Sequence, residues 1–154
     1  MVSRSLSGVD EVEPTVEDAI GLAARLHRGV RYPSPGAEPY IFHPLRVMLR
    51  FADPVDQTTA VLHDVVEDTR ITLDDLRDAG YRPEAIDAIG ALTHHTHDSY
   101  EQYIESVARN PVARRVKIAD LEENLANNRR SPLAPGNADR IRRYEAALDR
   151  LRVT

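Results

Sequence analysis

The segment AVLHDVVEDT, residues 60–69, gathers residues that could hold a cation and handle protons. His63 and Asp64 are adjacent, and Glu67 and Asp68 follow about one helical turn later. If the segment is a helix, these four lie on one arc, opposite the aliphatic residues, and the carboxylates repel one another. No Lys or Arg within the segment offsets that repulsion. The pattern therefore indicates either an acidic helix face open to water or part of a site for a divalent metal.

A metal bound by His63 and Asp64 would need ligands from other segments. The chain has no cysteine, so imidazole and carboxylate groups are the available ligands. His43, in the segment PYIFHP, precedes Pro44 where a helix is expected to start. It is a candidate ligand, although taken alone a histidine at such a position is more often a core residue.

Asp120, in the segment VKIADLEENL, is the other candidate ligand. Helical spacing places Lys117, Asp120 and Asn124 on one narrow polar stripe. Taken alone, Lys117 and Asp120 would form a surface ion pair that contributes less than about 1 kcal/mol. Lys117 is, however, the only lysine in the chain.

The elements that must position these residues are predicted to be helices. Thr15, Thr72 and Ser99 have the residue type and context of helix N-caps. The segments RYPSPGAEPY and SPLAPGN are expected to be loops. Between these signals apolar residues recur at helical spacing, and no period-two alternation persists. The predicted fold class is all-α, a bundle of about seven or eight short helices.

Length and composition limit the domain organisation and the partners. A chain of 154 residues suits one domain, here residues 14–154, after a disordered or loosely packed lead-in, residues 1–13. A net charge of −5 does not favour a nucleic-acid polymer as partner. No apolar run approaches membrane-spanning length, and the first residues lack the apolar stretch of a signal peptide. We expect a cytoplasmic protein without a membrane partner; the oligomeric state is left open.

The motifs together resemble those of the HD-domain metal-dependent phosphohydrolases. The chain reads LAARLHRG, PYIFHPLRV, AVLHDVVEDT, AGY followed by ALT, and VKIADLEENL. In order and separation these are similar to the motifs of RelA/SpoT hydrolase domains and of small alarmone hydrolases, over about residues 15–127. The resemblance implies the HD-domain helical bundle as the fold.

The resemblance also implies roles for individual residues. It assigns four metal ligands, namely His43, His63, Asp64 and Asp120. Glu67 and Asp68 correspond to the catalytic pair that positions the attacking water and assists proton transfer. Manganese is the metal usual in the alarmone hydrolases. Their reaction removes the 3′-pyrophosphate from guanosine tetraphosphate (ppGpp).

The segment HRGVRY departs from the family pattern, which often reads H-G-Q--R and carries an arginine that packs on guanine. Tyr32 stands in the place of that arginine, and Arg31 lies one residue early. We therefore expect a weaker guanine preference. The candidate substrate-binding residues are Arg31, Tyr32, His94, Lys117 and Asn124. The histidines of HHTH, residues 94–97, either contact phosphate or are simply solvated.

The sequence thus predicts a metal-dependent phosphohydrolase that acts on a small phosphorylated nucleotide, most specifically as a ppGpp 3′-pyrophosphohydrolase. Two alternatives stay open. One is an HD hydrolase of another nucleotide or small phosphate ester. The other is a metal-bound but catalytically inactive module that senses a nucleotide; the presence of both Glu67 and Asp68 speaks against it.

Overall fold

The computed structural model describes residues 12–32, 36–130 and 134–153. Over these ranges the chain forms helices and no strand, apart from an isolated bridge between Arg31 and Pro39, so the all-α prediction is confirmed. Most of the lead-in expected at residues 1–13 lies outside the described residues. The helices within the described ranges are α1 (Val16–Leu26), α2 (Phe42–Met48), α3 (Pro54–Leu62), α4 (Val65–Asp68), α5 (Leu73–Asp78), α6 (Pro83–Leu92), α7 (Tyr100–Ala108), α8 (Pro111–Arg129) and α9 (Asn137–Arg152).

Capping boxes begin three of these helices. Thr15, Thr72 and Ser99 each accept a hydrogen bond from the backbone N–H three residues later, and the side chain of that later residue accepts one from the N-cap backbone. Proline occupies the first turn of α3, α6 and α8, where its missing N–H costs no helical hydrogen bond. The helices α1, α5 and α7 therefore begin at the predicted caps. The helix expected to start at Pro44 begins two residues earlier, at Phe42, so His43 lies inside α2.

The segment AVLHDVVEDT is not one helix, so that part of the prediction is wrong. α3 ends at Leu62 and α4 begins at Val65, with His63 and Asp64 in the turn between them. His63 Nδ1 lies 2.6 Å from the carbonyl oxygen of Ala60. In an unbroken helix that carbonyl would accept from the N–H of Asp64. The imidazole takes that place, and His63 is buried rather than exposed on an acidic face.

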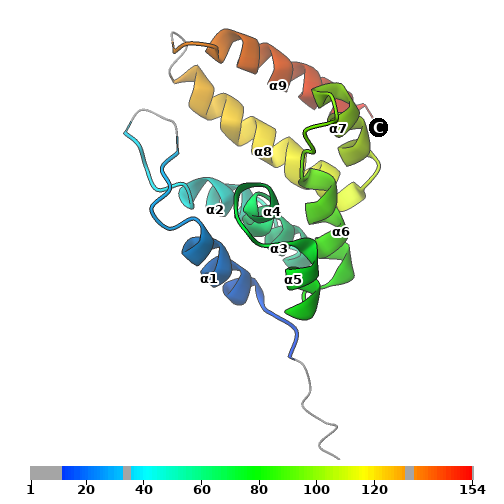
Figure 1. Cartoon of the computed structure of the whole chain (residues 1–154). Coiled ribbons are helices and arrows are strands. Elements are labelled where there is room, and N and C mark those ends of the chain that lie inside the picture. The colour runs from blue at the N-terminus through cyan, green and yellow to red at the C-terminus, as the bar shows by residue number, and fades with distance from the viewer. Residues whose placement is uncertain (1–11, 33–35, 131–133, 154) are drawn as a thin grey trace, which may run out of the picture.

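The long helix α8 organises the bundle (Figure 1). It packs against α2, α3 and α6 on one side, while α9 runs beside it. Buried side chains from most of the helices share one core, among them Leu62 of α3, Ile89 of α6, Leu121 of α8 and Leu151 of α9. This packing places the start of α2, the turn after α3 and the middle of α8 close together. No helix in the described ranges is long and apolar enough to cross a membrane.

The cap of α7 offers a test of the fold. Ser99→Ala removes the acceptor for the Gln102 N–H, which lies 3.1 Å from the Ser99 hydroxyl oxygen. We expect the free energy of unfolding, measured by urea denaturation, to fall by about 1 kcal/mol. Ser106→Ala, at an exposed position of the same helix, is the matched control and should change it by less than about 0.5 kcal/mol. Equal effects of the two substitutions would contradict the capping role.

Candidate metal centre

Three side chains from distant segments converge in the interior. His43 of α2, His63 of the turn after α3 and Asp120 of α8 each offer one ligand atom, and these atoms all lie within 4.8 Å of one another. Asp120 Oδ1 is 2.8 Å from His43 Nε2 and 3.4 Å from His63 Nε2. All three residues are buried. We call them the three-residue cluster.

Asp64 lies at the edge of the three-residue cluster. Its Oδ2 is 3.1 Å from His63 Nε2 and accepts a hydrogen bond from the Tyr40 hydroxyl. The structure therefore brings the fourth predicted ligand beside the other three. Asp64 is not, however, one of the residues whose ligand atoms all lie within 4.8 Å of one another.

The His63 imidazole shows that this arrangement fits a cation. Its Nδ1 carries the hydrogen, because the Ala60 carbonyl oxygen at 2.6 Å can only accept. The other nitrogen, Nε2, is buried and makes no hydrogen bond, although carboxylate oxygens of Asp64 and Asp120 lie near it. If the ring is neutral, the lone pair of Nε2 faces the negatively charged carboxylates of Asp64 and Asp120, and a cation between them would bind all three groups. A second-shell carbonyl that fixes the tautomer in this way is usual for histidines that bind metals.

The spacing of the ligand atoms fits the same conclusion. Nitrogen and oxygen ligands that share one ion at about 2.1 Å lie roughly 3.0 to 3.4 Å apart in octahedral and tetrahedral sites. His63 Nε2 lies 3.1 Å from Asp64 Oδ2 and 3.4 Å from Asp120 Oδ1, within this range, whereas His43 Nε2 and Asp120 Oδ1 are slightly closer, at 2.8 Å. The residues present therefore suit a divalent metal.

The two carboxylates nearest the histidines are ionised. Burial by itself would lower the pKa of His63, but the carboxylates of Asp64 and Asp120 raise it well above its ordinary value. Burial would raise the pKa of Asp64, but His63 brings it down to about 2. Asp120 also stays ionised, because Lys117 and the two histidines hold its pKa well below the ordinary value despite burial. The carboxylates are thus in the charged form that metal ligation needs.

Lys117 neutralises one side of Asp120. Its Nζ donates to Asp120 Oδ2 at 2.9 Å and lies 5.4 Å from the centre of the Tyr103 ring. Burial would lower the pKa of Lys117, but Asp120 raises it well above its ordinary value. The sequence offered this contact as a surface ion pair. The pair is present but lies largely inside the protein, because the Lys117 side chain is only 14% exposed.

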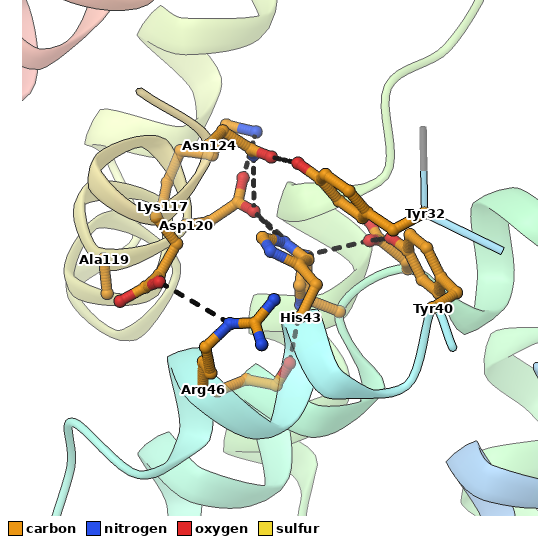
Figure 2. Close-up of polar contacts among 12 residues, drawn as sticks. Tyr32, Tyr40, His43, Arg46, Lys117, Ala119, Asp120 and Asn124 are labelled. Atoms are coloured by element: carbon orange, nitrogen blue, oxygen red, sulfur yellow. Dashed lines mark hydrogen bonds and ion pairs between the residues drawn. The ribbon is translucent and has the colours of Figure 1, made fainter. Parts of the chain in front are cut away.

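Asn124, one turn further along α8, contacts the other oxygen of Asp120. Its Nδ2 donates to Asp120 Oδ1 at 3.0 Å, and its Oδ1 accepts from the hydroxyl of Tyr32. Figure 2 shows Asp120 surrounded by His43, Lys117 and Asn124, with Tyr32 beyond the amide. Two residues predicted to bind substrate, Tyr32 and Asn124, thus form hydrogen bonds within the protein.

Glu67 and Asp68 lie on α4, directly after the turn that carries Asp64, and both are exposed. Partial desolvation, followed by the charge of Asp64, raises the pKa of each carboxyl. Lys117 acts in the opposite direction on Glu67. The pair therefore stands beside the cluster, open to solvent, and Glu67 is more basic than an ordinary glutamate.

The remaining predicted substrate residues, Arg31 and His94, form no hydrogen bond with the three-residue cluster within the described residues. Arg31 is exposed, and its side chain makes no hydrogen bond or ion pair with the described residues. The ring of His94 stacks on Tyr103 with centroids 4.7 Å apart, and its Nε2 lies 3.0 Å from the Asp98 carbonyl oxygen. The Tyr103 ring thus contacts both His94 and Lys117. His95 is exposed.

Tyr40 is a site residue that the sequence did not indicate. Its hydroxyl donates a hydrogen bond to Asp64. The three-residue spacing between Tyr40 and His43 is about one turn, which could have placed both on the same side of the chain.

The chain has relatives among named 3′-pyrophosphohydrolases. No family model matches the chain. The chain is 31% identical over 137 residues to the guanosine-3′,5′-bis(diphosphate) 3′-pyrophosphohydrolase MESH1 of Mus musculus, a match that covers 82% of this chain and 76% of that protein. It is 28% identical over 137 residues to the MESH1 protein of Danio rerio, with the same coverage of 82% and 76%.

A bacterial relative matches over a shorter segment. The chain is 44% identical over 66 residues to the GTP pyrophosphokinase of Streptomyces coelicolor, 40% of this chain but only 8% of that much longer protein.

A solved structure described as a metazoan orthologue of SpoT that hydrolyses ppGpp superimposes with a TM-score of 0.75 at 22% identity, over 96% of this chain and 89% of that one. This likeness supports the fold.

Loss of one candidate ligand tests the metal centre. Asp120→Asn keeps the size of the side chain and removes its charge. We expect the affinity for Mn²⁺, measured by isothermal titration calorimetry, to fall by more than about 100-fold, because outer-shell partners alone are worth 10- to 100-fold. Asp149→Asn, at an exposed position on α9, is the control and should bind Mn²⁺ like the wild type. Unchanged affinity of a folded Asp120→Asn protein would remove Asp120 from the site.

Proposed function

The chain belongs to the MESH1 family of guanosine-3′,5′-bis(diphosphate) 3′-pyrophosphohydrolases, and on that premise we propose that it removes the 3′-pyrophosphate of ppGpp with the help of a divalent metal. The observation that carries the proposal is the meeting of His43, His63 and Asp120 beside the carboxylates of α4. The substrate is a small phosphorylated nucleotide, and we place the reaction in the cytoplasm.

The metal would be held by His43, His63, Asp64 and Asp120. When bound, a divalent ion at such a site makes water a better nucleophile and polarises a phosphoryl oxygen. We propose manganese, because the donor set mixes imidazole with carboxylate and because the resembling alarmone hydrolases use it. Lys117 remains paired with Asp120 and keeps that carboxylate charged and fixed in position.

Glu67 is the proposed general base. It lies within one turn of the cluster, and its raised pKa makes it a better proton acceptor than an ordinary glutamate. Hydrolysis adds the oxygen of water to the 3′ phosphorus and breaks the bond from that phosphorus to the ribose 3′ oxygen. Glu67 takes the proton that water loses, and a proton passes to the 3′ oxygen as pyrophosphate leaves. Asp68, next in the chain, orients the water.

Base selection is proposed to be weaker than in a hydrolase that holds guanine against an arginine. Tyr32 replaces that arginine, and its hydroxyl is bonded to Asn124. Arg31 is exposed one position earlier. The same cluster would therefore also serve hydrolysis of a related nucleotide with a different base.

Replacing the proposed base separates chemistry from metal binding. Glu67→Gln should retain the Mn²⁺ affinity of the wild type and lower the turnover of ppGpp under Mn²⁺ by about 100-fold or more, because a proton acceptor is lost while every proposed ligand stays. Release of pyrophosphate measures turnover. Glu84→Gln, an exposed glutamate in the first turn of α6, is the matched control and should be as active as the wild type.

Two results would contradict this proposal. Full activity of Glu67→Gln would exclude Glu67 as the base. A wild-type protein that binds Mn²⁺ but releases no pyrophosphate from ppGpp would exclude the proposed substrate and leave the metal centre in place.

A further inference from the structure

Backbone pairing between residues 30–32 and 38–40 brings Tyr32 to the metal centre. The Tyr32 N–H donates to the Glu38 carbonyl oxygen at 3.0 Å, and the Tyr40 N–H donates to the Val30 carbonyl oxygen at 2.9 Å. These bonds flank the bridge between Arg31 and Pro39. They hold the rings of Tyr32 and Tyr40 nearly parallel, with centroids 5.9 Å apart. The position of the Tyr32 hydroxyl is therefore set by backbone pairing as well as by its own rotamer.

The Tyr32 hydroxyl reaches α8 at the amide of Asn124 (Figure 2). The phenol donates to Asn124 Oδ1, so the other end of the amide, Nδ2, faces Asp120. A primary amide has an acceptor end and a donor end, and fixing one end fixes the other. Without the phenol, a rotated Asn124 would turn its oxygen towards the carboxylate, which would repel it.

The carboxylate of Asp120 depends on that donor. Its Oδ1 accepts from Asn124 Nδ2 at 3.0 Å and lies 2.8 Å from His43 Nε2, while its Oδ2 accepts from Lys117 at 2.9 Å. Contacts at both oxygens hold the carboxylate plane in one orientation. Loss of the Asn124 contact leaves the Oδ1 side without its only amide donor among the described residues.

We propose that Tyr32 is a positioning residue of the metal centre, which orients Asp120 through the side chain of Asn124. Through the Tyr32–Asn124–Asp120 relay, the segment that carries Tyr32 supports the metal site as well as any bound nucleotide. Outer-shell partners of this kind typically change metal affinity or activity by 10- to 100-fold. The inference rests on the proposed function only in that the three-residue cluster binds a divalent ion.

Phenylalanine at position 32 distinguishes this role from contact with a base. Tyr32→Phe keeps the aromatic ring and removes only the hydroxyl. A ring that merely stacks on a nucleotide keeps its effect in this variant, whereas a hydroxyl that orients Asn124 loses it.

The experiment is a double-mutant cycle with Mn²⁺ affinity as the readout. Tyr32→Phe, Asn124→Ala and the double variant are titrated with Mn²⁺ by calorimetry, after circular dichroism has verified folding. We expect Tyr32→Phe to weaken Mn²⁺ binding by about tenfold. In the Asn124→Ala background the same change should have no further effect, because the relay is already broken. Tyr81→Phe, which removes a buried tyrosine hydroxyl beside Asp18 and Arg25 of α1, is the matched control and should bind Mn²⁺ normally.

Kinetics with ppGpp add a second readout. Tyr32→Phe should lower kcat at limiting Mn²⁺ and leave the KM for the nucleotide unchanged. The proposal would be overturned if Tyr32→Phe bound Mn²⁺ as tightly as the wild type, or if the effects of the two substitutions simply added. A raised KM with unchanged Mn²⁺ affinity would likewise overturn it and would make Tyr32 a nucleotide contact. Calorimetry needs no substrate, so a protein that fails to hydrolyse ppGpp can still show the relay.

Discussion

The buried carboxylate of Asp120 is the constraint on which the site depends. A charge in the interior is costly unless it is paired, and here Lys117, His43 and Asn124 all direct contacts to it. Removing any one of these partners would leave the buried charge less well compensated. The same residue joins α8 to α2 and to the turn after α3. The geometry of the metal centre therefore depends on the packing of α8, because that packing brings the Asp120 carboxylate against the two histidines.

The break between α3 and α4 also places a site residue in the interior, His63. A continuous helix would have placed His63 with the carboxylates on one polar arc. The turn instead buries His63 and leaves Glu67 and Asp68 exposed at the rim. One segment of ten residues thus supplies both interior candidate ligands and the solvent-facing pair that is proposed for proton transfer. The Ala60 carbonyl oxygen fixes the imidazole tautomer at the point where α3 ends.

Much of the fold could be predicted from the sequence because its signals are local. Capping boxes at Thr15, Thr72 and Ser99 act within four residues, and each one forms. The turn at His63 could not be predicted, because a side chain that competes for a backbone carbonyl leaves no trace in apolar periodicity. The convergence of His43, His63 and Asp120 was expected from a family resemblance; spacing along the chain does not show that residues 57 positions apart meet. The hydroxyl contacts of Tyr32 and Tyr40 depend on how a loop folds back, which no local pattern encodes.

Four side chains from three segments are proposed to bind a single divalent ion. A crystal structure of the protein grown with Mn²⁺, with anomalous diffraction recorded at the manganese edge, tests this directly. We expect one anomalous peak, from an ion bonded to His43, His63, Asp64 and Asp120 at about 2.0 to 2.3 Å. A strong peak elsewhere, or none at the cluster in crystals saturated with Mn²⁺, would contradict it.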